Sequence, residues 1–390
     1  MNFDRNTVLG FVLLAVLFFG YFYYTNLEQA SYNKAKARQQ FVQDSIAKAN
    51  RPLVDTIATA NSIAKADSSL RAAAAGYFVA AAQGVEELQT VENEKMKVVF
   101  TNKGGQVKSV ILKEHAQYGD DKPVTLAATN FGRFGYALNT GLNRTAPSAE
   151  LFFSLKGIEK NSDGAQIISF VLASADSSFA GRITHQYTVY PNDYRINLQL
   201  DIDSPAQLFT QGVMPFLWQY EALKQESDIA YEKQNTQVGF VEDGAFDYFT
   251  IGNRSTVDFA KPVGWVGVRQ RFFFAALEAP ANFTSGQLSW VLPPDSTGSV
   301  VRTTAAMKMQ LPAATRSSVN LKFYYGPADY AVLKKYDNEQ LHTLILWLQT
   351  NNLLTEISTQ LLLGQIIKIQ KFAYPALAEL LKSLALVKRL

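Results

Sequence analysis

Residues 194–203 read YRINLQLDID, and their pattern sets the class of structure. Apolar and polar side chains alternate at every position, which is typical of a β-strand with one buried and one solvated face. A second candidate strand, ITHQYTVY at 183–190, ends just before Pro191, Asn192 and Asp193. A three-residue connection between the two predicts an antiparallel hairpin.

The same alternation continues along the chain. It recurs at 307–311 and at 319–325, and further candidate strands are MKVVF before the turn 102–105, QIISFVLA, VGWVGVRQRFFFAAL and LSWVL. Helical patterns of 10 to 15 residues are missing between these segments, which disfavours a parallel sheet with crossover helices. We therefore predict a mainly β fold with one large antiparallel β-sandwich at 91–328.

The pattern changes to helix after Gly326 and Pro327. We predict amphipathic helices within a C-terminal segment at 329–390, with Pro375 separating two halves. Neither half is an apolar run of 18 residues, so no second membrane span is predicted. The last helix either lies in a membrane interface or packs on the sandwich or on another copy. The residues that carry these patterns are Leu353, Ile357, Leu361, Leu377, Leu380, Leu381, Leu384, Lys382, Lys388 and Arg389.

A charge-free run near the start, VLGFVLLAVLFFGYFYY from Val8 to Tyr24, predicts a transmembrane anchor at 1–27. With its uncharged flanks the run is long enough, at about 31 Å, to cross one hydrocarbon core. The alternative is a cleaved signal sequence, but the run ends in aromatic residues of the kind found at membrane interfaces. The charges on its two sides leave its orientation open. Residues 28–90, rich in alanine and polar residues, are predicted to be a flexible tether.

The composition excludes several functions. There are 37 basic and 34 acidic residues, a net charge of +3, which gives no reason to expect a nucleic-acid partner. The chain has no cysteine, so disulfides, thiol catalysis and thiolate metal sites are excluded.

Few residues suggest catalysis, and we predict no catalytic, cofactor-binding or metal-binding residue. The histidines His115, His185 and His342 are too far apart for a metal-ligand motif. His185 lies inside a strand pattern, which favours a structural or surface role. Two carboxylate pairs lie in polar stretches, where a solvated loop explains them better than acid–base catalysis. These pairs are Asp228 with Glu232 and Glu242 with Asp243.

Two further motifs have simple structural interpretations. Gly104 and Gly105 predict a tight turn with positive φ rather than a phosphate loop, because no lysine and helix follow them as a P-loop requires. The run 272–274, after Arg269 and Arg271, could stack on a sugar or base. We favour a buried strand, because continuous apolar runs are typical of strands covered on both faces.

Four segments resemble the YidC family of bacterial membrane protein insertases. They are FDRNTVLGFVLLAVLFF, TNKGGQVKSVILKEH, GWVGVRQRFFFAAL and LKFYYGPADYAVLKKYD, in the order found in that family. The resemblance covers residues 1–340 and includes the anchor, the tether and the β domain.

The resemblance implies a location and a function. It implies a protein of the bacterial inner membrane with a cytoplasmic N-terminus and a periplasmic β super-sandwich related to mutarotase folds. It further implies insertion and folding of inner-membrane proteins, without enzymatic chemistry or a cofactor. The implied partners are nascent membrane proteins, components of the Sec translocon and the lipid bilayer.

The C-terminal part departs from that family, which continues into five transmembrane helices around a groove with a functional arginine. The residues after 341 do not supply these spans, and we expect a truncated or frame-changed product. No groove arginine is matched, and Arg389 is interpreted as an ordinary cationic helix end.

Two alternatives stay open. The first is an anchored carbohydrate-binding or carbohydrate-active sandwich, which needs a cleft combining aromatic residues with a histidine and a carboxylate. The second is a scaffold for Sec-associated partners.

Overall fold

The stretch 194–203 forms strand β10 (Arg195–Asp203) in the computed structural model, which describes residues 69–119, 122–176, 179–252 and 254–336. The apolar positions from Ile196 to Ile202 are buried, as the alternation predicts. β10 pairs antiparallel with β9 (Arg182–Val189), so the predicted hairpin is confirmed. On its other side it pairs with β19 (Arg316–Pro327).

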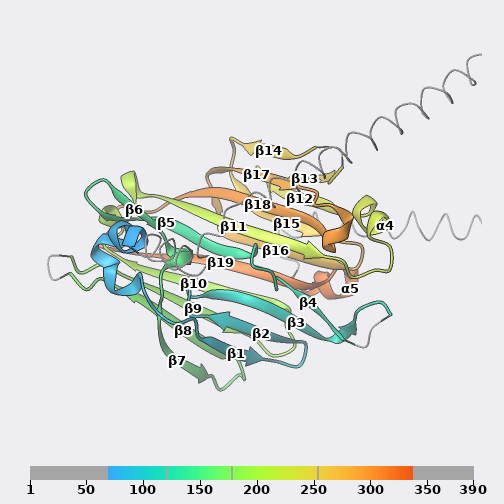
Figure 1. Cartoon of the computed structure of the whole chain (residues 1–390), viewed down its shortest axis with the longest axis horizontal. Helices are drawn as coiled ribbons and strands as arrows, with labels where there is room; N and C mark the ends of the chain where they lie inside the picture. Colours follow the sequence, from blue (N-terminus) through green and yellow to red (C-terminus); the bar gives the residue numbers. More distant parts are fainter. Residues whose placement is uncertain (1–68, 120–121, 177–178, 253, 337–390) are drawn as a thin grey trace, which may run out of the picture. The chain divides into compact units, whose positions relative to one another are not determined.

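The described strands form three antiparallel sheets, which confirms the predicted mainly β class (Figure 1). The nine-stranded sheet has the order β13 (Ala245–Thr250), β12 (Gln237–Glu242), β15 (Val263–Arg269), β16 (Phe273–Phe283), β19, β10, β9, β8 (Gln166–Ala173), β7 (Ser154–Lys160). The six-stranded sheet has the order β14 (Thr256–Phe259), β17 (Ser285–Val291), β18 (Ser299–Gln310), β11 (Val213–Leu223), β5 (Arg133–Gly141), β6 (Arg144–Pro147). The four-stranded sheet has the order β1 (Leu88–Glu92), β2 (Met96–Thr101), β3 (Gln106–Ala116), β4 (Pro123–Leu126).

Short helices precede the first strand, connect some of the strands and follow the last one. They are η1 (Gly76–Ala81), η2 (Ser148–Glu150), α3 (Pro205–Leu208), η3 (Thr210–Gly212), α4 (Ile229–Gln234), η4 (Asp295–Thr297), α5 (Tyr330–Leu333) and η5 (Lys334–Tyr336).

The two smaller sheets pack on one face of the nine-stranded sheet, and the core lies between these layers. Phe323 of β19 meets Phe134 of β5 edge to face, with ring centroids 5.2 Å apart. Phe100 of β2 contacts Tyr187 of β9 at 4.9 Å between ring centroids. Burying such rings removes large apolar areas from water, about 25 cal/mol for each Å². The sandwich predicted for 91–328 is therefore a two-layer structure built from three sheets.

The described residues upstream of 91, where composition suggests that the tether ends, already contain helical structure. Residues 69–75 are helical and continue into η1, where Phe78 is fully buried. The Thr140 hydroxyl on β5 donates a hydrogen bond to the carbonyl of Ala74. Gly76 has a φ of +50° and lies so close to the Thr140 carbonyl that a Cβ would collide with it. The segment is thus docked on β5, at the left of Figure 1.

The run VGWVGVRQRFFFAAL was predicted as a single strand, and this prediction is wrong. It is a hairpin of β15 and β16, in which Arg269 is paired with Phe274. The chain turns at 270–272, where Gln270 donates its backbone N–H to the carbonyl of Phe273. Phe272 therefore lies at the turn and is exposed, whereas Phe273 and Phe274 are buried in β16 as expected.

After β19 the chain forms α5 and η5, the last elements described. The Tyr336 hydroxyl accepts a hydrogen bond from the backbone N–H of Tyr194 at 3.1 Å, which holds this segment to the start of β10. Within 69–336, apart from the gaps given above, no helix has the length and apolarity needed to span a bilayer. The predicted anchor at 8–24, the predicted C-terminal helices, His342 and Arg389 lie outside the described residues.

Candidate functional site

A large cleft opens at the end of the sandwich where β19 leads into α5. It is formed by the end of β3, by α4 with the segment before it, by the β15–β16 turn and by the start of α5, elements that Figure 1 places together at its right-hand end. Its volume is about 1020 Å³. We call it the exit cleft and define it by Glu114, His115, Ala116, Tyr118, Gln225, Glu226, Tyr231, Asn235, Arg269, Arg271, Phe272, Phe273, Pro327, Ala328, Asp329 and Ala331.

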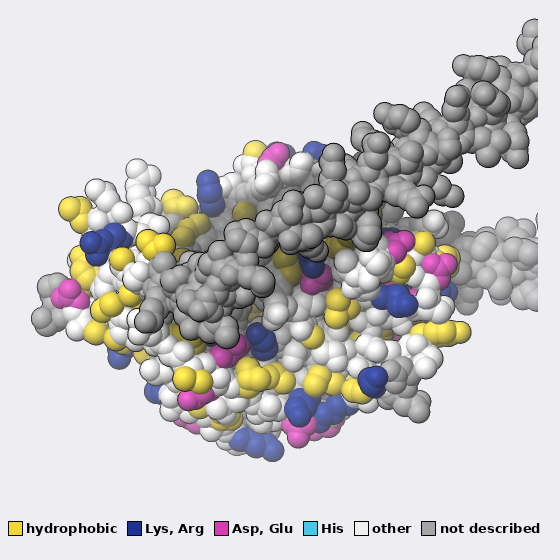
Figure 2. All heavy atoms as spheres, viewed as in Figure 1, with side chains coloured by type: hydrophobic (Ala, Val, Ile, Leu, Met, Phe, Trp, Pro, Cys, Tyr) yellow, Lys and Arg dark blue, Asp and Glu magenta, His cyan; other side chains and the backbone are white. Residues whose placement is uncertain are grey.

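The rim of the exit cleft carries exposed aromatic rings. Tyr118 is 70% exposed, Phe272 51% and Tyr231 43%. The Arg271 guanidinium lies over two of these rings, 5.1 Å from the centroid of Tyr231 and 4.6 Å from that of Phe272. Figure 2 shows hydrophobic, basic and acidic side chains mixed at this end of the molecule. Exposed aromatic and arginine side chains are the types that most often anchor binding partners.

Beneath the rim, a buried carboxylate braces the cleft wall. Glu232 of α4 accepts hydrogen bonds from the backbone N–H groups of Gln225 at 3.0 Å and Glu226 at 3.3 Å. It also accepts one from the Gln270 side chain at 2.8 Å. Burial raises the pKa of Glu232, with these hydrogen bonds acting in the opposite direction. One side chain thus ties together the segment before α4 and the β15–β16 turn.

Asp228 and Glu232 lie in a short helix rather than in the long loop that the sequence suggested. Asp228 caps α4, since its carboxylate accepts hydrogen bonds from the N–H groups of Ala230 and Tyr231 at 2.8 and 3.1 Å. Asp228 therefore caps the helix, and Glu232 accepts hydrogen bonds that join the segment before α4 to the β15–β16 turn. Both carboxylates have a structural role.

Glu242 and Asp243 form the other carboxylate pair and lie at the turn between β12 and β13. The Asp243 carboxylate forms an ion pair with the Lys261 ammonium group at 3.0 Å. Both are away from the residues that form the exit cleft.

One wall of the exit cleft is formed by Glu114 and His115 at the end of β3, and Tyr194, which is not among the lining residues, contacts both. The His115 Nε2 and the Tyr194 hydroxyl are 3.4 Å apart, and the same hydroxyl donates to Glu114 at 3.4 Å. Glu114 is also held by Lys95 at 2.8 Å, which lowers its pKa. Burial lowers the pKa of His115. A smaller cavity of about 150 Å³ adjoins this wall and reaches Tyr336.

Gln225 contributes a buried side-chain acceptor beside the exit cleft. The Gln225 side chain is 94% buried and donates its N–H to the carbonyl of Leu223 at 3.2 Å. Its carbonyl oxygen has no hydrogen-bond partner among the residues that the structure describes. A buried acceptor in this state is costly unless a ligand or water satisfies it.

His185 is far inside the sandwich and has a structural role. Its Nδ1 donates to the carbonyl of Gly105 at 2.8 Å, and its Nε2 accepts from the Tyr136 hydroxyl at 2.5 Å. Tyr187 donates to the same carbonyl at 2.9 Å. Burial lowers the pKa of His185 to about 4. Gly104 and Gly105 have φ values of +77° and +52°, so the predicted turn with positive φ is confirmed.

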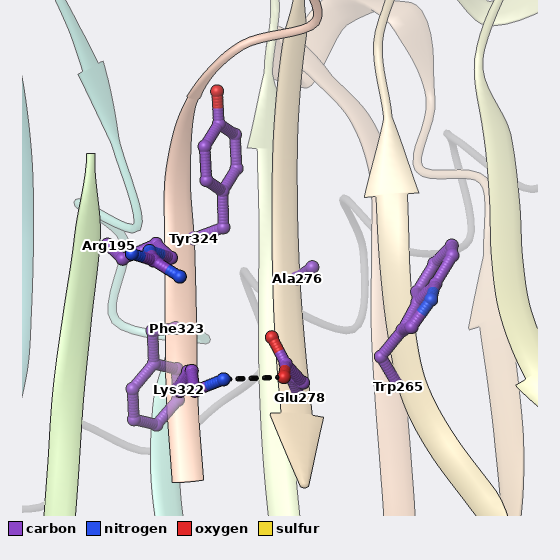
Figure 3. A pocket seen from close by; sticks show the side chains of 7 residues that line it. All are labelled: Arg195, Trp265, Ala276, Glu278, Lys322, Phe323 and Tyr324. Atoms are coloured by element: carbon purple, nitrogen blue, oxygen red, sulfur yellow. Dashed lines mark hydrogen bonds and ion pairs between the residues drawn. The ribbon is translucent and has the colours of Figure 1, made fainter. Parts of the chain in front are cut away.

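A further pocket lies on the outer face of the nine-stranded sheet (Figure 3). Lys322 of β19 and Glu278 of β16 face each other across the strands and form an ion pair at 2.8 Å. Arg195 and Tyr324 lie beside this pair, and the Trp265 ring points away from it. The space between them, about 10 Å³, is enough for about one water molecule and for no larger ligand.

The sequence had marked only part of the exit cleft. It singled out His115, Arg269, Arg271 and the phenylalanines 272–273, which the structure brings together there. It missed Gln225, Tyr118 and Tyr231, which have no distinguishing pattern around them. No group of three or more His, Asp or Glu side chains suited to a metal ion occurs in the described part of the chain.

Several known proteins are similar to this chain. A relative from Phocaeicola vulgatus named membrane protein insertase YidC is 24% identical over 85% of this chain and 51% of its own length. Relatives of the same name from Porphyromonas gingivalis and Chlorobium limicola are 25% and 26% identical, each over 86% of this chain and over 53% and 55% of their own lengths. The chain thus spans about half the length of these curated relatives.

Solved structures of mutarotase-like proteins are also similar. A galactose mutarotase-like protein from Lactobacillus casei has a TM-score of 0.38 at 12% identity, covering 61% of this chain and 100% of its own. A galactose mutarotase related enzyme from Lactobacillus acidophilus has a TM-score of 0.36 at 10% identity, covering 61% and 97%. Similarity at this level says nothing about ligand or activity.

The comparison with family models identifies the group to which the chain belongs. The model of the YidC periplasmic domain matches residues 88–347, which include all three sheets and continue through α5 and η5. This match covers well over half of the chain, and the relatives that share it are named alike. The chain therefore belongs to the YidC family.

Proposed function

We propose that this protein takes part in the insertion and folding of bacterial inner-membrane proteins, alone or beside the Sec translocon. The observation that carries the proposal is the family match over residues 88–347, together with relatives named membrane protein insertase over 85 to 86% of the chain. The proposed partners are nascent membrane proteins, Sec translocon components and the lipid bilayer.

The proposed arrangement follows from the family and from the sequence. Residues 1–27 anchor the chain in the inner membrane with a cytoplasmic N-terminus, and a tether that begins at residue 28 links this anchor to the periplasmic sandwich. The sequence placed the end of the tether at 90 and the sandwich at 91–328, but the docked helix and η1 at 69–81 and the start of β1 at Leu88 support a domain that begins upstream of residue 91. Residues 329–390 form a helical segment.

We further propose that the domain binds rather than catalyses. The candidate acid–base groups are engaged structurally: Glu232 braces backbone groups, Asp228 caps α4, and His185 is fully buried between Tyr136 and Gly105. Glu114 is paired with Lys95. A general acid or base has to reach a substrate proton, and these partners hold the groups in other roles.

The proposal is tested with stalled nascent chains. The full 390-residue chain, carrying an affinity tag, is expressed in bacteria that also make ribosome-stalled chains of either a small membrane protein or a secreted protein. After mild solubilisation and tag purification, we expect at least fivefold more of the membrane-protein nascent chain. Equal recovery of the two nascent chains would contradict the proposed function. A tagged, unrelated single-span protein is the control for recovery through the bilayer alone.

One observation favours a second candidate, a carbohydrate-binding domain. The exit cleft combines aromatic rings with His115 and Glu114, the composition that such a site requires. Saturable binding of soluble oligosaccharides to the purified full chain would support this candidate. The insertase proposal expects no such binding.

A further inference from the structure

We propose that the exit cleft binds an extended polypeptide segment that has little net charge and carries aromatic side chains. This inference rests on the proposed function, and it identifies the bound segment as a translocated loop of a membrane-protein substrate. Four properties of the cleft carry it: its size, its aromatic rim, its ordered wall and its balance of charge.

The size of the exit cleft favours a chain-like ligand. Pockets for small molecules usually measure about 300–1,000 Å³ and enclose most of their ligand. The exit cleft has about 1020 Å³, opens at the end of the sandwich and is lined by four separate segments of the chain. An extended peptide can contact all four segments at once, whereas a single sugar ring cannot.

The rim offers anchoring sites for aromatic side chains. Phe272 and Tyr231 flank Arg271, which stacks on both rings, and Tyr118 adds a third exposed ring from the segment after β3. An aromatic side chain that enters the cleft would replace water on apolar ring faces. Contacts between aromatic rings contribute about 0.5–1.5 kcal/mol beyond the area they bury.

The wall beneath the rim is ordered before a ligand binds. Glu232 accepts hydrogen bonds from the backbone N–H groups of Gln225 and Glu226, two residues of the exit cleft, and from the Gln270 side chain in the β15–β16 turn. A site that is already ordered loses less entropy when it binds.

The charges of the exit cleft are balanced, which argues against a strongly charged ligand. The three carboxylates of Glu114, Glu226 and Asp329 are matched by the guanidinium groups of Arg269 and Arg271 and by the ammonium group of Lys95. Each carboxylate has a local partner: Lys95 for Glu114, Arg271 at 3.9 Å for Glu226, and the N–H groups of Ala331 and Val332 in α5 for Asp329. An anionic lipid surface would require an excess of cations, and a strongly basic or acidic peptide would find no excess of opposite charge.

The test uses a photo-cross-linker and a defined peptide. Benzoylphenylalanine replaces Phe272 in the full chain, purified in a non-ionic detergent. The matched control carries it in place of Leu142, which is 90% exposed at the turn between β5 and β6, at the other end of the sandwich. The probe is a biotinylated peptide of 12 residues that contains glycine, serine and three phenylalanines and no charged side chain.

We expect at least fivefold more labelling at position 272 than at position 142. An excess of the same peptide without biotin should abolish the difference. Substitutions Arg271→Gln and Tyr118→Ser should each lower peptide binding at least threefold, whereas Leu142→Ser should not change it. Arg271, Tyr118 and Leu142 are substantially exposed, so these variants should keep their tryptophan emission spectrum.

Three outcomes would overturn the proposal. The first is equal labelling at positions 272 and 142. The second is loss of labelling when a maltohexaose solution is added, which would assign the exit cleft to sugars. The third is loss of labelling when phosphatidylglycerol vesicles are added, with no loss when the peptide without biotin is added. That result would assign the exit cleft to lipid. If the peptide labels position 272 while nascent chains fail to co-purify, the proposed function fails and the peptide site stands.

Discussion

His185 should make the folded domain sensitive to mild acid. It is fully buried on β9, with Tyr136 on one ring nitrogen and the Gly105 carbonyl on the other, and burial lowers its pKa to about 4. In the unfolded chain its pKa returns to about 6.5. Between about pH 6.5 and pH 4, His185 is therefore protonated in the unfolded state and neutral in the folded state. The folded protein loses stability as the pH falls below about 6.5.

The size of this effect follows from the two pKa values. Between pH 7.5 and pH 5 the unfolded state gains about 2 kcal/mol from protonation of this one histidine, while the folded state gains almost none. The loss is complete, at about 3 kcal/mol, once the pH falls below about 4. Other groups that titrate in this pH range also change the free energy of unfolding. The contribution of His185 therefore has to be measured as the difference between the unmodified protein and a variant without it.

The informative variant is the double substitution Tyr136→Phe with His185→Leu. It replaces both members of a buried hydrogen bond by apolar side chains, a change that costs little when both partners are removed. The Gly105 carbonyl keeps the hydrogen bond from Tyr187. Urea unfolding of the full chain in detergent, followed by fluorescence of the buried Trp218, Trp265 and Trp290, gives the free energy of unfolding at each pH.

We expect the unmodified protein to lose about 2 kcal/mol more than the double variant between pH 7.5 and 5. The single variant Tyr136→Phe is the control: it should cost about 1–3 kcal/mol at pH 7.5, because the histidine loses its donor, and should keep the pH dependence. An identical pH dependence in the unmodified protein and the double variant would refute the assignment to His185.

Three more predictions concern residues that position the layers and the exit cleft. Phe78→Ala should lower the free energy of unfolding by about 3–5 kcal/mol in the same urea assay, because the ring is fully buried where η1 docks on the sandwich. Gly105→Ala should cost about 1–3 kcal/mol in a thermal melt, since φ is +52° and the new Cβ would lie 3.0 Å from the Phe153 ring. Glu232→Ala should cost about 1–3 kcal/mol in urea unfolding and weaken peptide binding, because two backbone N–H groups lose their acceptor and the Gln270 side chain loses one of its two hydrogen bonds.

Each of these substitutions has a matched control. Val79→Ala changes an exposed residue of the same η1 and should cost less than about 1 kcal/mol. Gly244 has a φ of +77°, and a Cβ added there would meet open space. The loss of stability in Gly244→Ala therefore measures backbone strain without a steric clash. Glu159→Ala removes an exposed carboxylate from β7. If a test variant and its control lose equal stability, the contact assigned to the test residue is wrong.

The alternation of apolar and polar residues predicted β10, β18 and β19. It works where a strand has one buried and one solvated face, as in β10. It failed at β15 and β16, because six consecutive residues from Val263 to Val268 are buried and show no period. The turn that follows, at 270–272, contains no glycine, proline or asparagine to mark it.

The exit cleft could be predicted only in part. Arg269, Arg271 and Phe272 lie together in the sequence and suggested stacking on a sugar or base, but a buried strand was favoured for 272–274, which is wrong for the exposed Phe272. Tyr118 and Gln225 are brought to them by the pairing of distant strands, which no local pattern encodes. The short helix α4 was missed because six residues are too few to show a helical period. Its capping residue, Asp228, was the available signal.

The position of the last two strands has a consequence for how this domain folds during synthesis. β18 lies between β17 and β11, and β19 lies between β16 and β10, so each joins two parts of a sheet that are built from earlier residues. Until residue 327 has emerged, β10 and β16 each present an open edge, and such edges readily pair with other chains. The domain therefore completes its fold only when nearly the whole described segment is available, and its half-sheets need protection from aggregation until then.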